Sequence, residues 1–132
     1  MIITRECDYG VRIIRGLLST EIQTVNDICK KEHVPVQYAY KILKKLERYG
    51  LVKSYRGPKG GYQLRKSPND IKLFDIVAAI DGDLFVNACL RRGFSCPLNT
   101  SGEECDVHKE LLRIKAGIID LFSEKSMAEI LG

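Results

Sequence analysis

The sequence predicts a mainly α-helical chain with one small β-hairpin wing: a winged helix-turn-helix followed by a long C-terminal helix. Three observations support this fold class. Three segments before residue 50 space their apolar residues at helical intervals, two short alternating segments flank a glycine-rich turn at 57–61, and a heptad pattern occupies 105–122. With 132 residues and 45% hydrophobic composition, the chain has the size of one small domain, or of one domain with an appendage.

The first two helices are expected within the N-terminal 32 residues. Apolar residues at helical spacing predict a helix from about Asp8, which we expect to cap it, to about Ser19. A second helix should begin at Thr24, because a threonine caps helices well and Asp27, three residues later, resembles the second half of a capping box. This helix should end at about Glu32, ahead of a break at 34–35.

The third predicted helix, 36–49, has two chemically different faces, and Gly50 supplies its left-handed C-terminal stop. At about 100° per residue, one face is apolar and suited to a core. It consists of Val36, Ala39, Leu43 and Leu46. The opposite face is a row of cations, with Gln37 beside it. The cations are Lys41, Lys44, Lys45 and Arg48.

Two alternating segments, 51–56 and 62–65, predict a hairpin whose turn carries Arg56 and Lys59. Three helices followed by a hairpin is the order of a winged helix-turn-helix, which places its second motif helix in the major groove of DNA. The basic hairpin could reach the phosphate backbone or the minor groove beside that helix.

The charge of the chain is divided unevenly between its two halves. Residues 1–66 contain 14 Lys and Arg against 6 Asp and Glu, whereas residues 67–132 contain 7 against 11. A concentrated positive half favours a polyanionic partner, and nucleic acid is the first candidate. The alternative is a charged face that is merely solvated. We therefore expect a DNA-binding domain over 1–66.

Residues 67–132 should contain a short helix, a loop and a long helix. The short helix is expected at 73–81, with Phe74, Val77 and Ile80 buried and Gly82 at its end. Residues 83–104 have little periodicity and predict a loop. The long helix at 105–122 has an apolar heptad face, which favours a homodimer interface over packing on its own chain, and a two-fold dimer would match palindromic half-sites in DNA. The heptad residues are Val107, Leu111, Ile114, Ile118 and Leu121.

The five cysteines fall into two groups. An odd number, in a chain whose first residues lack the pattern of a signal peptide and which has no long apolar segment, makes a disulfide framework unlikely and predicts a cytoplasmic protein. Cys7 and Cys29 lie on apolar helical patterns and are expected in the core. The loop group has the spacing C-x6-C-x8-C-x2-H and consists of Cys89, Cys96, Cys105 and His108.

Thiolates in such a loop group bind iron–sulfur clusters, zinc or copper(I), and spacing alone does not choose among them. Without a metal, two of the thiols could form a redox disulfide. His33, at the turn before the third helix, is expected to face solvent or to cap. An enzyme is not predicted, because the sequence has neither a C-x-x-C pair nor a phosphate-binding glycine loop in the strand-to-helix context that it needs.

Four segments are distributed along most of the length of the chain: DYGVRIIRGL at 8–17, LERYGLVKSYRGPKGGYQL at 46–64, FDIVAAIDG at 74–82, and the cysteine loop that ends in CDVH at 105–108. Their combination resembles the Rrf2 family of bacterial winged-helix regulators, in particular its iron–sulfur members of the IscR and NsrR types. The resemblance implies a homodimeric transcription factor in which an iron–sulfur cluster, 2Fe–2S or 4Fe–4S, controls the DNA that it binds.

Carried over by position, the resemblance implies roles for individual residues. Cys89, Cys96 and Cys105 would be cluster ligands and His108 the fourth, although Asp8 resembles the aspartate ligand of the 4Fe–4S branch. Arg56 resembles an arginine that enters the minor groove. Recognition-helix positions correspond to Gln37, Tyr38, Tyr40 and Lys41. Where the IscR type has glutamate and glutamine, this chain has Tyr40 and Lys41, so the resemblance does not carry over the operator sequence of that type.

Overall fold

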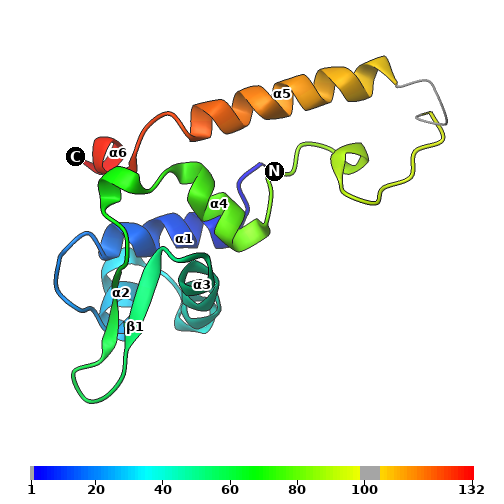
Figure 1. Ribbon diagram of the computed structural model, residues 1–132. Helices are drawn as coiled ribbons and strands as arrows, with labels where there is room; N and C mark the ends of the chain where they lie inside the picture. Colours follow the sequence, from blue (N-terminus) through cyan, green and yellow to red (C-terminus); the bar gives the residue numbers. More distant parts are fainter. Residues whose placement is uncertain (1, 99–104) are drawn as a thin grey trace.

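The computed structural model describes residues 2–98 and 105–132. Its helices and strands follow the predicted order, with three helices, a hairpin and a long helix that lies at the opposite end of the molecule from the hairpin (Figure 1). The elements are α1 (Arg5–Gly16), α2 (Val25–Glu32), α3 (Val36–Tyr49), β1 (Val52–Tyr55), β2 (Gly61–Leu64), the 3-10 turn η1 (Pro68–Asp70), α4 (Leu73–Asp81), the 3-10 turn η2 (Ala88–Leu90), α5 (Asp106–Phe122) and α6 (Met127–Leu131).

Helix α1 begins earlier than the sequence indicated, and its cap is Thr4 instead of Asp8. The Thr4 hydroxyl accepts a hydrogen bond from the amide of Cys7 at 3.2 Å. Asp8 lies inside the first turns and pairs with Arg12, one turn later on the same helix, at 3.2 Å. The prediction of Asp8 as the cap was wrong because a threonine four residues upstream offers the same acceptor in extended backbone.

Helices α2 and α3 begin and end close to their predicted residues. The Thr24 hydroxyl accepts from the amide of Asp27 at 3.1 Å, and α2 ends at His33, an exposed residue in the left-handed conformation with φ 55°. Helix α3 ends at Gly50, which has φ 91°. At the C-terminus of each helix the next residue has a left-handed conformation, which is a common way for a helix to end.

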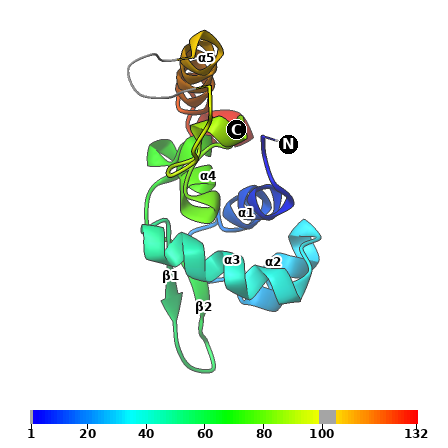
Figure 2. The same cartoon turned by 90° about the vertical axis from the view of Figure 1, so that its right-hand side faces the viewer.

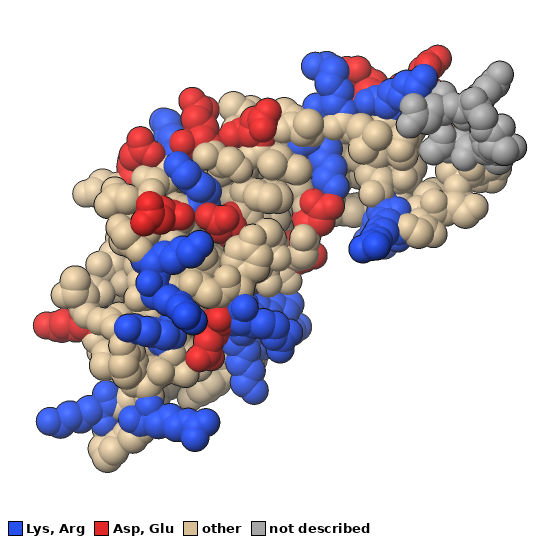
Figure 3. Space-filling model, in the orientation of Figure 1, with Lys and Arg blue, Asp and Glu red and all other residues tan. Residues whose placement is uncertain are grey.

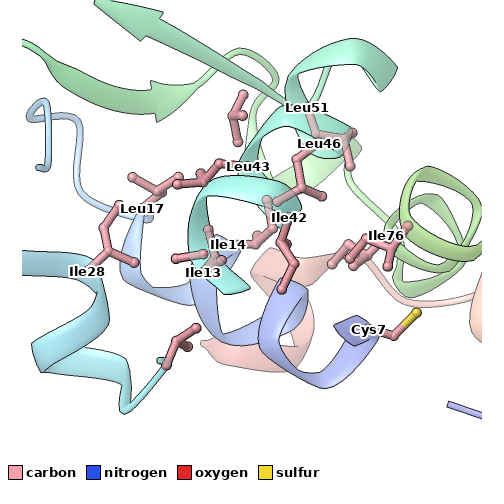
Figure 4. Close-up of a cluster of buried hydrophobic side chains, with 14 of the residues drawn as sticks. Cys7, Ile13, Ile14, Leu17, Ile28, Ile42, Leu43, Leu46, Leu51 and Ile76 are labelled. Carbon is pink, nitrogen blue, oxygen red and sulfur yellow. The ribbon is translucent and has the colours of Figure 1, made fainter. Parts of the chain in front are cut away.

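The buried face of α3 is rotated from the predicted one. Ala39, Ile42, Leu43 and Leu46 are fully buried, whereas Val36 is 41% exposed. Val36 is the first residue of the helix, where no neighbouring helix covers it, and Ile42 takes its place because α1 and α4 both contact α3. Figure 4 shows Ile42, Leu43 and Leu46 in one cluster with side chains of α1, α2 and α4.

The hairpin is antiparallel, with Val52 opposite Leu64 and Tyr55 opposite Gly61. A third segment, which the sequence did not predict, pairs with it: Gln23 and Tyr62 exchange backbone hydrogen bonds of 2.9 and 2.8 Å. The loop before α2 therefore lies along the second strand. This contact fixes the base of the hairpin against the helical core.

Helix α4 has the predicted bounds and ends at Gly82, which has φ 80°. Its buried residues are Ile76, Val77 and Ile80, while the predicted Phe74 is only partly buried. Helix α1 packs closely on α4 at Gly10. If position 10 had a β-carbon, that atom would lie 2.2 Å from the δ-methyl of Ile80. Glycine at position 10 thus allows the close approach of the two helices.

The C-terminal segment contains α6, a short helix that the sequence analysis did not predict. The Ser126 hydroxyl accepts from the amide of Glu129 at 3.1 Å, and the Glu129 carboxylate accepts from the amide of Ser126 at 2.7 Å. Met127 is fully buried, and its amide donates to the carbonyl of Ile71 at 2.7 Å. Five residues are too few for a visible helical period, so only the capping box pointed to this helix.

Helix α5 agrees with the prediction, with Cys105 as its N-cap residue, and it lies across the end of the molecule beyond α4 (Figures 1 and 2). The domain boundary predicted after Lys66 stays a prediction. The buried cluster contains side chains from both sides of it, such as Leu46 before the boundary and Ile76 and Met127 after it. Among residues 2–98 and 105–132, no helix combines the length and apolar character needed to cross a membrane.

Candidate nucleic-acid interface and cysteine loop

The exposed side of α3 presents polar, aromatic and basic side chains. Tyr38 is 40% and Tyr40 50% exposed. Gln37, Lys41, Lys44 and Arg48 are also exposed, and Lys45 is partly buried. Figure 3 shows Lys and Arg side chains over this part of the molecule and at the end of the hairpin. The residues predicted to contact DNA therefore lie on two adjacent elements of one end of the molecule.

Two of the basic residues on α3 are engaged by one carboxylate of α1. Glu6 accepts a hydrogen bond from Lys41 Nζ at 2.8 Å and another from Lys45 Nζ at 3.2 Å. Lys45 Nζ also donates to the carbonyl of Ile80 at 3.1 Å, near the end of α4. The hydrogen bond from Lys41 is the main reason that the pKa of Glu6 lies below its ordinary value.

Tyr38 packs against an aromatic residue of α1. Its ring centroid lies 5.7 Å from that of Tyr9, and the Arg12 guanidinium lies 6.0 Å from the Tyr9 centroid. Despite this contact, Tyr38 remains 40% exposed. A ring held by a second aromatic side chain loses less conformational freedom on contacting a base or sugar.

The hairpin has a fixed base and an exposed tip. The Tyr55 hydroxyl donates to Gln63 Oε1 at 3.0 Å, and the Gln63 amide nitrogen donates to the carbonyl of Thr20. Arg56 and Lys59 are exposed in the turn between the strands. Both cations are thus free to contact a surface beyond the end of the hairpin, while the strands behind them are held.

The cysteines divide as expected between core and loop. Cys7 and Cys29 are buried, and Cys89, Cys96 and Cys105 are partly exposed. Cys7 Sγ donates to the carboxylate of Asp81 at 3.1 Å, and burial, aided by Asp81, raises the pKa of Cys7 to about 11. A thiol with so high a pKa is a poor nucleophile at neutral pH.

The predicted ligands are not gathered into one site in the described part of the chain. Cys89 lies in η2, where the Asn87 side-chain amide donates to its sulfur at 3.4 Å, and Cys105 is the N-cap residue of α5. Within residues 2–98 and 105–132, no three His, Cys, Asp or Glu side chains come together in a way that would hold a metal ion. Residues 99–104, between Cys96 and Cys105, lie outside the described residues.

His108 has one feature that its surroundings do not explain. In the first turn of α5, its Nδ1 atom is buried and has no hydrogen-bond partner. A buried polar atom without a partner is uncommon, because burial removes its hydrogen bonds to water. Three cysteine side chains together with an imidazole nitrogen that needs a partner form a donor set that suits a thiophilic metal centre.

A cleft of about 430 Å³ lies where the cysteine loop meets the helical core. Asp81 and Asp83 line it from the end of α4, and Lys115 lines it from α5. Lys115 pairs with Asp83, and the Arg91 guanidinium lies 4.4 Å from the centroid of the Phe85 ring. The Lys115–Asp83 pair joins α5 to the residues that follow α4, and the Arg91–Phe85 contact joins two parts of the loop.

The heptad residues of α5 differ in exposure. Val107 is 65%, Leu121 71% and Ile114 40% exposed, whereas Leu111 and Ile118 are partly buried. Ile118, with the neighbouring Ile119 and Phe122, packs against the core of its own chain. One part of the predicted face is therefore covered within the chain, and the other part remains exposed.

Sequence reasoning missed the contributions of Glu6, Tyr9 and Asp81. Glu6 contacts a helix that begins 30 residues later, and Asp81 contacts the first turn of α1 from the far end of α4. No local period links such distant residues. The closely spaced acids and bases at 5–8 were the one visible signal that this turn is charged.

Three helices, a paired hairpin and a basic exposed end together define a winged helix-turn-helix DNA-binding protein. The Rrf2 family, described as iron-dependent transcriptional regulators, matches residues 3–132. The chain belongs to this family and is a DNA-binding transcriptional regulator.

Relatives and solved structures agree with that assignment. The chain is 35% identical over 104 residues to a protein of Haemophilus influenzae named as an HTH-type transcriptional regulator, covering 79% of this chain and 67% of the relative. It is 28% identical over 105 residues to the transcriptional regulator IscR of Vibrio campbellii, covering 80% of this chain and 60% of the relative.

Among solved structures, IscR of T. potens superimposes with a TM-score of 0.71 at 24% identity, covering 99% of this chain and 86% of that chain. CymR of B. subtilis, titled a global cysteine regulator, superimposes with a TM-score of 0.73 at 22% identity, covering 98% and 95%. At these identities the two structures support the fold.

Proposed function

We propose that this regulator is a homodimer that binds a palindromic operator in double-stranded DNA and that an iron–sulfur cluster held by its cysteine loop controls this binding. The observation that supports it most directly is the donor set: Cys89, Cys96 and Cys105 have partly exposed side chains, and His108 has a buried nitrogen without a hydrogen-bond partner among the described residues. The family description, iron-dependent transcriptional regulators, agrees with a site for iron.

The DNA-binding part of the proposal rests on exposure and charge. Gln37, Tyr38 and Tyr40 would contact base edges from the start of α3, and Arg56 would enter the minor groove from the hairpin. Phosphate contacts are assigned to cations that carry no sequence information and fix the position of the protein. These are Lys41, Lys44, Lys45, Arg48 and Lys59.

The three thiolates and the His108 imidazole would hold the cluster, which supplies a centre that responds to iron supply, oxidants or nitric oxide. Binding it would link Cys89 in η2 to Cys105 at the start of α5. Residues 82–88 connect Cys89 to the end of α4, and Lys45 of α3 donates to the Ile80 carbonyl in the last turn of α4. A cluster bound to the loop would therefore act on the pose of α3 through the end of α4.

Dimerisation is assigned to the exposed part of the α5 heptad face. Val107, Ile114 and Leu121 leave an apolar strip along a helix that has no fully buried residue within the chain. A second α5 would cover this strip, and the two-fold axis would place two copies of α3 on successive half-sites.

The first test is purification without oxygen, followed by a visible spectrum and analysis of iron, sulfide and zinc. A brown protein with matched iron and sulfide supports the proposal, and the iron count separates 2Fe–2S, which we favour, from 4Fe–4S. Variants Cys89→Ala, Cys96→Ala and Cys105→Ala should lose the colour, whereas Cys29→Ala, at a buried core cysteine, should keep it. His108→Ala against Asp8→Asn identifies the fourth ligand.

Other outcomes of the same measurement identify the alternatives. One zinc per chain would replace the cluster by a structural zinc. A metal-free protein that forms a disulfide among the loop cysteines would indicate a thiol switch. The CymR structure from Staphylococcus aureus, which shares this fold with a TM-score of 0.71, is titled as an oxidised form. In both cases the DNA-binding part of the proposal would be kept and the iron–sulfur cluster would be rejected.

The second test measures control. Affinity for an operator selected from random DNA should differ between the cluster-loaded and the metal-free protein, and Cys96→Ala should change which sequences are selected. Equal affinity and unchanged selection would overturn control by the loop.

A further inference from the structure

The contact between Glu6 and α3 has a consequence for DNA binding that does not involve the cysteine loop. Lys41 and Lys45 are two of the cations that face the proposed interface, and both donate to the same carboxylate, at 2.8 and 3.2 Å. Lys41 remains 59% exposed, and Glu6 is 27% exposed. The carboxylate therefore lies where it can compete with a phosphate group for the same ammonium groups.

We propose that Glu6 is an intramolecular competitor of DNA phosphate, which holds Lys41 and Lys45 and thereby lowers the affinity of the protein for DNA of any sequence. This inference rests on the DNA-facing role proposed for α3. Glu6, which lies in α1 and would not itself contact DNA, would thereby weaken sequence-independent binding.

The position of Glu6 is well determined, which makes it an effective competitor. It lies in the first turn of α1, between the cap residue Thr4 and the buried Cys7. Both neighbours are bonded to Asp81 of α4, with Thr4 donating at 3.0 Å and Cys7 at 3.1 Å. A carboxylate held in this way loses little conformational freedom on binding the two lysines, unlike one on a flexible surface segment.

Neutralising Glu6 should raise the affinity for DNA, for an electrostatic reason. Sequence-independent binding comes mainly from cations that displace counterions from phosphates. A lysine already paired with a carboxylate must break that pair, or bring a neutralised charge to the DNA. Removing the carboxylate while keeping its shape should restore one or two full cations to the interface.

The test compares Glu6→Gln with the parent protein in its metal-free, reduced form, using a short fluorescent duplex of random sequence across a salt series. We expect tighter binding by about threefold to tenfold, and a plot of log affinity against log salt that is steeper by about one to two, from a slope of about 0.9 per phosphate. The matched control is Glu110→Gln, which frees Arg113 on α5, far from α3, with the same change in net charge. It should leave both quantities nearly unchanged.

Two lysine variants separate this inference from the interface on which it rests. Lys44→Met and Lys41→Met should both weaken binding if α3 faces DNA. Glu6→Gln should have a smaller effect in the Lys41→Met background, where only Lys45 remains to be released. If the lysine variants weaken binding while Glu6→Gln leaves it unchanged or weakens it, the competitor role is overturned and the interface stands. If none of the α3 variants alters binding, the interface itself is overturned, and this inference with it. Circular dichroism melts confirm that each variant is folded.

Discussion

Cys7 donates its thiol hydrogen to the carboxylate of Asp81 across 3.1 Å, which joins the first turn of α1 to the last residue of α4. Asp81 also accepts from the Thr4 hydroxyl at 3.0 Å. The residue that caps α1 and the residue that begins the path to the cysteine loop are thus bonded to each other. This contact links the DNA-binding helices to the loop that follows α4.

Reactivity of Cys7 tests this contact. Its pKa is raised to about 11 by burial, with a further contribution from Asp81. Asp81→Asn removes the negative charge, so the pKa of Cys7 should fall and its alkylation by iodoacetamide at pH 8 should accelerate several-fold. Mass spectrometry of each cysteine peptide measures the rate. Cys29, which is buried without a carboxylate partner, is the internal control, and equal acceleration of both thiols would indicate general loosening instead of a local effect.

The ion pairs of Glu6 predict a dependence of stability on pH. Hydrogen bonding from Lys41 lowers the pKa of Glu6 below its ordinary value of 4.5, so the folded state binds this proton less readily than the unfolded state. The stabilisation is complete above pH 4.5 and is lost as the pH falls through the folded-state pKa. Glu6→Gln should cost about 1 kcal/mol or less at neutral pH.

Thermal melts at several pH values measure that difference. The gap between Glu6→Gln and the parent protein should close as the solution is acidified. It should also shrink at neutral pH in a Lys41→Met background, because the main partner is then absent. A gap that stays constant from neutral to acid pH would show that the amide disturbs packing and not charge.

The exposed strip of α5 predicts the effect of one buried charge on assembly. Ile114→Asp would place a carboxylate in the interface proposed between two chains, where it would lose its hydration without a partner. We expect monomers by sedimentation at concentrations where the parent protein is a dimer. Ala116→Asp, two residues away on the exposed opposite side of the same helix, should leave the dimer intact. Dissociation by both variants, or by neither, would contradict this interface.

The pairing of the hairpin with the loop before α2 predicts a strict requirement at position 61. A β-carbon on Gly61 would lie 2.3 Å from the carbonyl oxygen of Gln23, a backbone atom that cannot rotate away. Gly61→Ala should separate Gln23 from Tyr62 and lower stability by about 1–3 kcal/mol. Chemical denaturation measures the loss. Lys59→Ala, in the same turn, changes a side chain at an exposed position and should leave stability within about 0.5 kcal/mol of the parent.

Local patterns in the sequence account for most of the fold. Periodicity and capping chemistry predicted α2, α3 and α4 almost to the residue, because Thr24, Gly50 and Gly82 act on the backbone next to them. Helix α6 escaped detection because it is too short to show a period. Asp8 was misassigned as a cap because sequence alone does not rank it against Thr4.

The candidate site was less predictable, since it depends on contacts between distant parts of the chain. The basic face of α3 was visible in the sequence, but the carboxylate that pairs with it was not, because Glu6 and Lys41 meet only through the packing of α1 on α3. Likewise the heptad pattern of α5 did not reveal that Ile118 faces the core of its own chain while Leu121 remains exposed.

The amide of Met127 donates to the carbonyl of Ile71, so the chain returns after α5 to the point from which α4 departs. Residues 82–126 therefore form a segment whose two ends lie on the same core. The entropic cost of closing such a segment grows only slowly with its length. Leu84 and Ile118 both contact the core, so the length of the chain between them can change at little cost in loop-closure entropy. The composition of that stretch can therefore vary independently of the helices and hairpin that form the rest of the molecule.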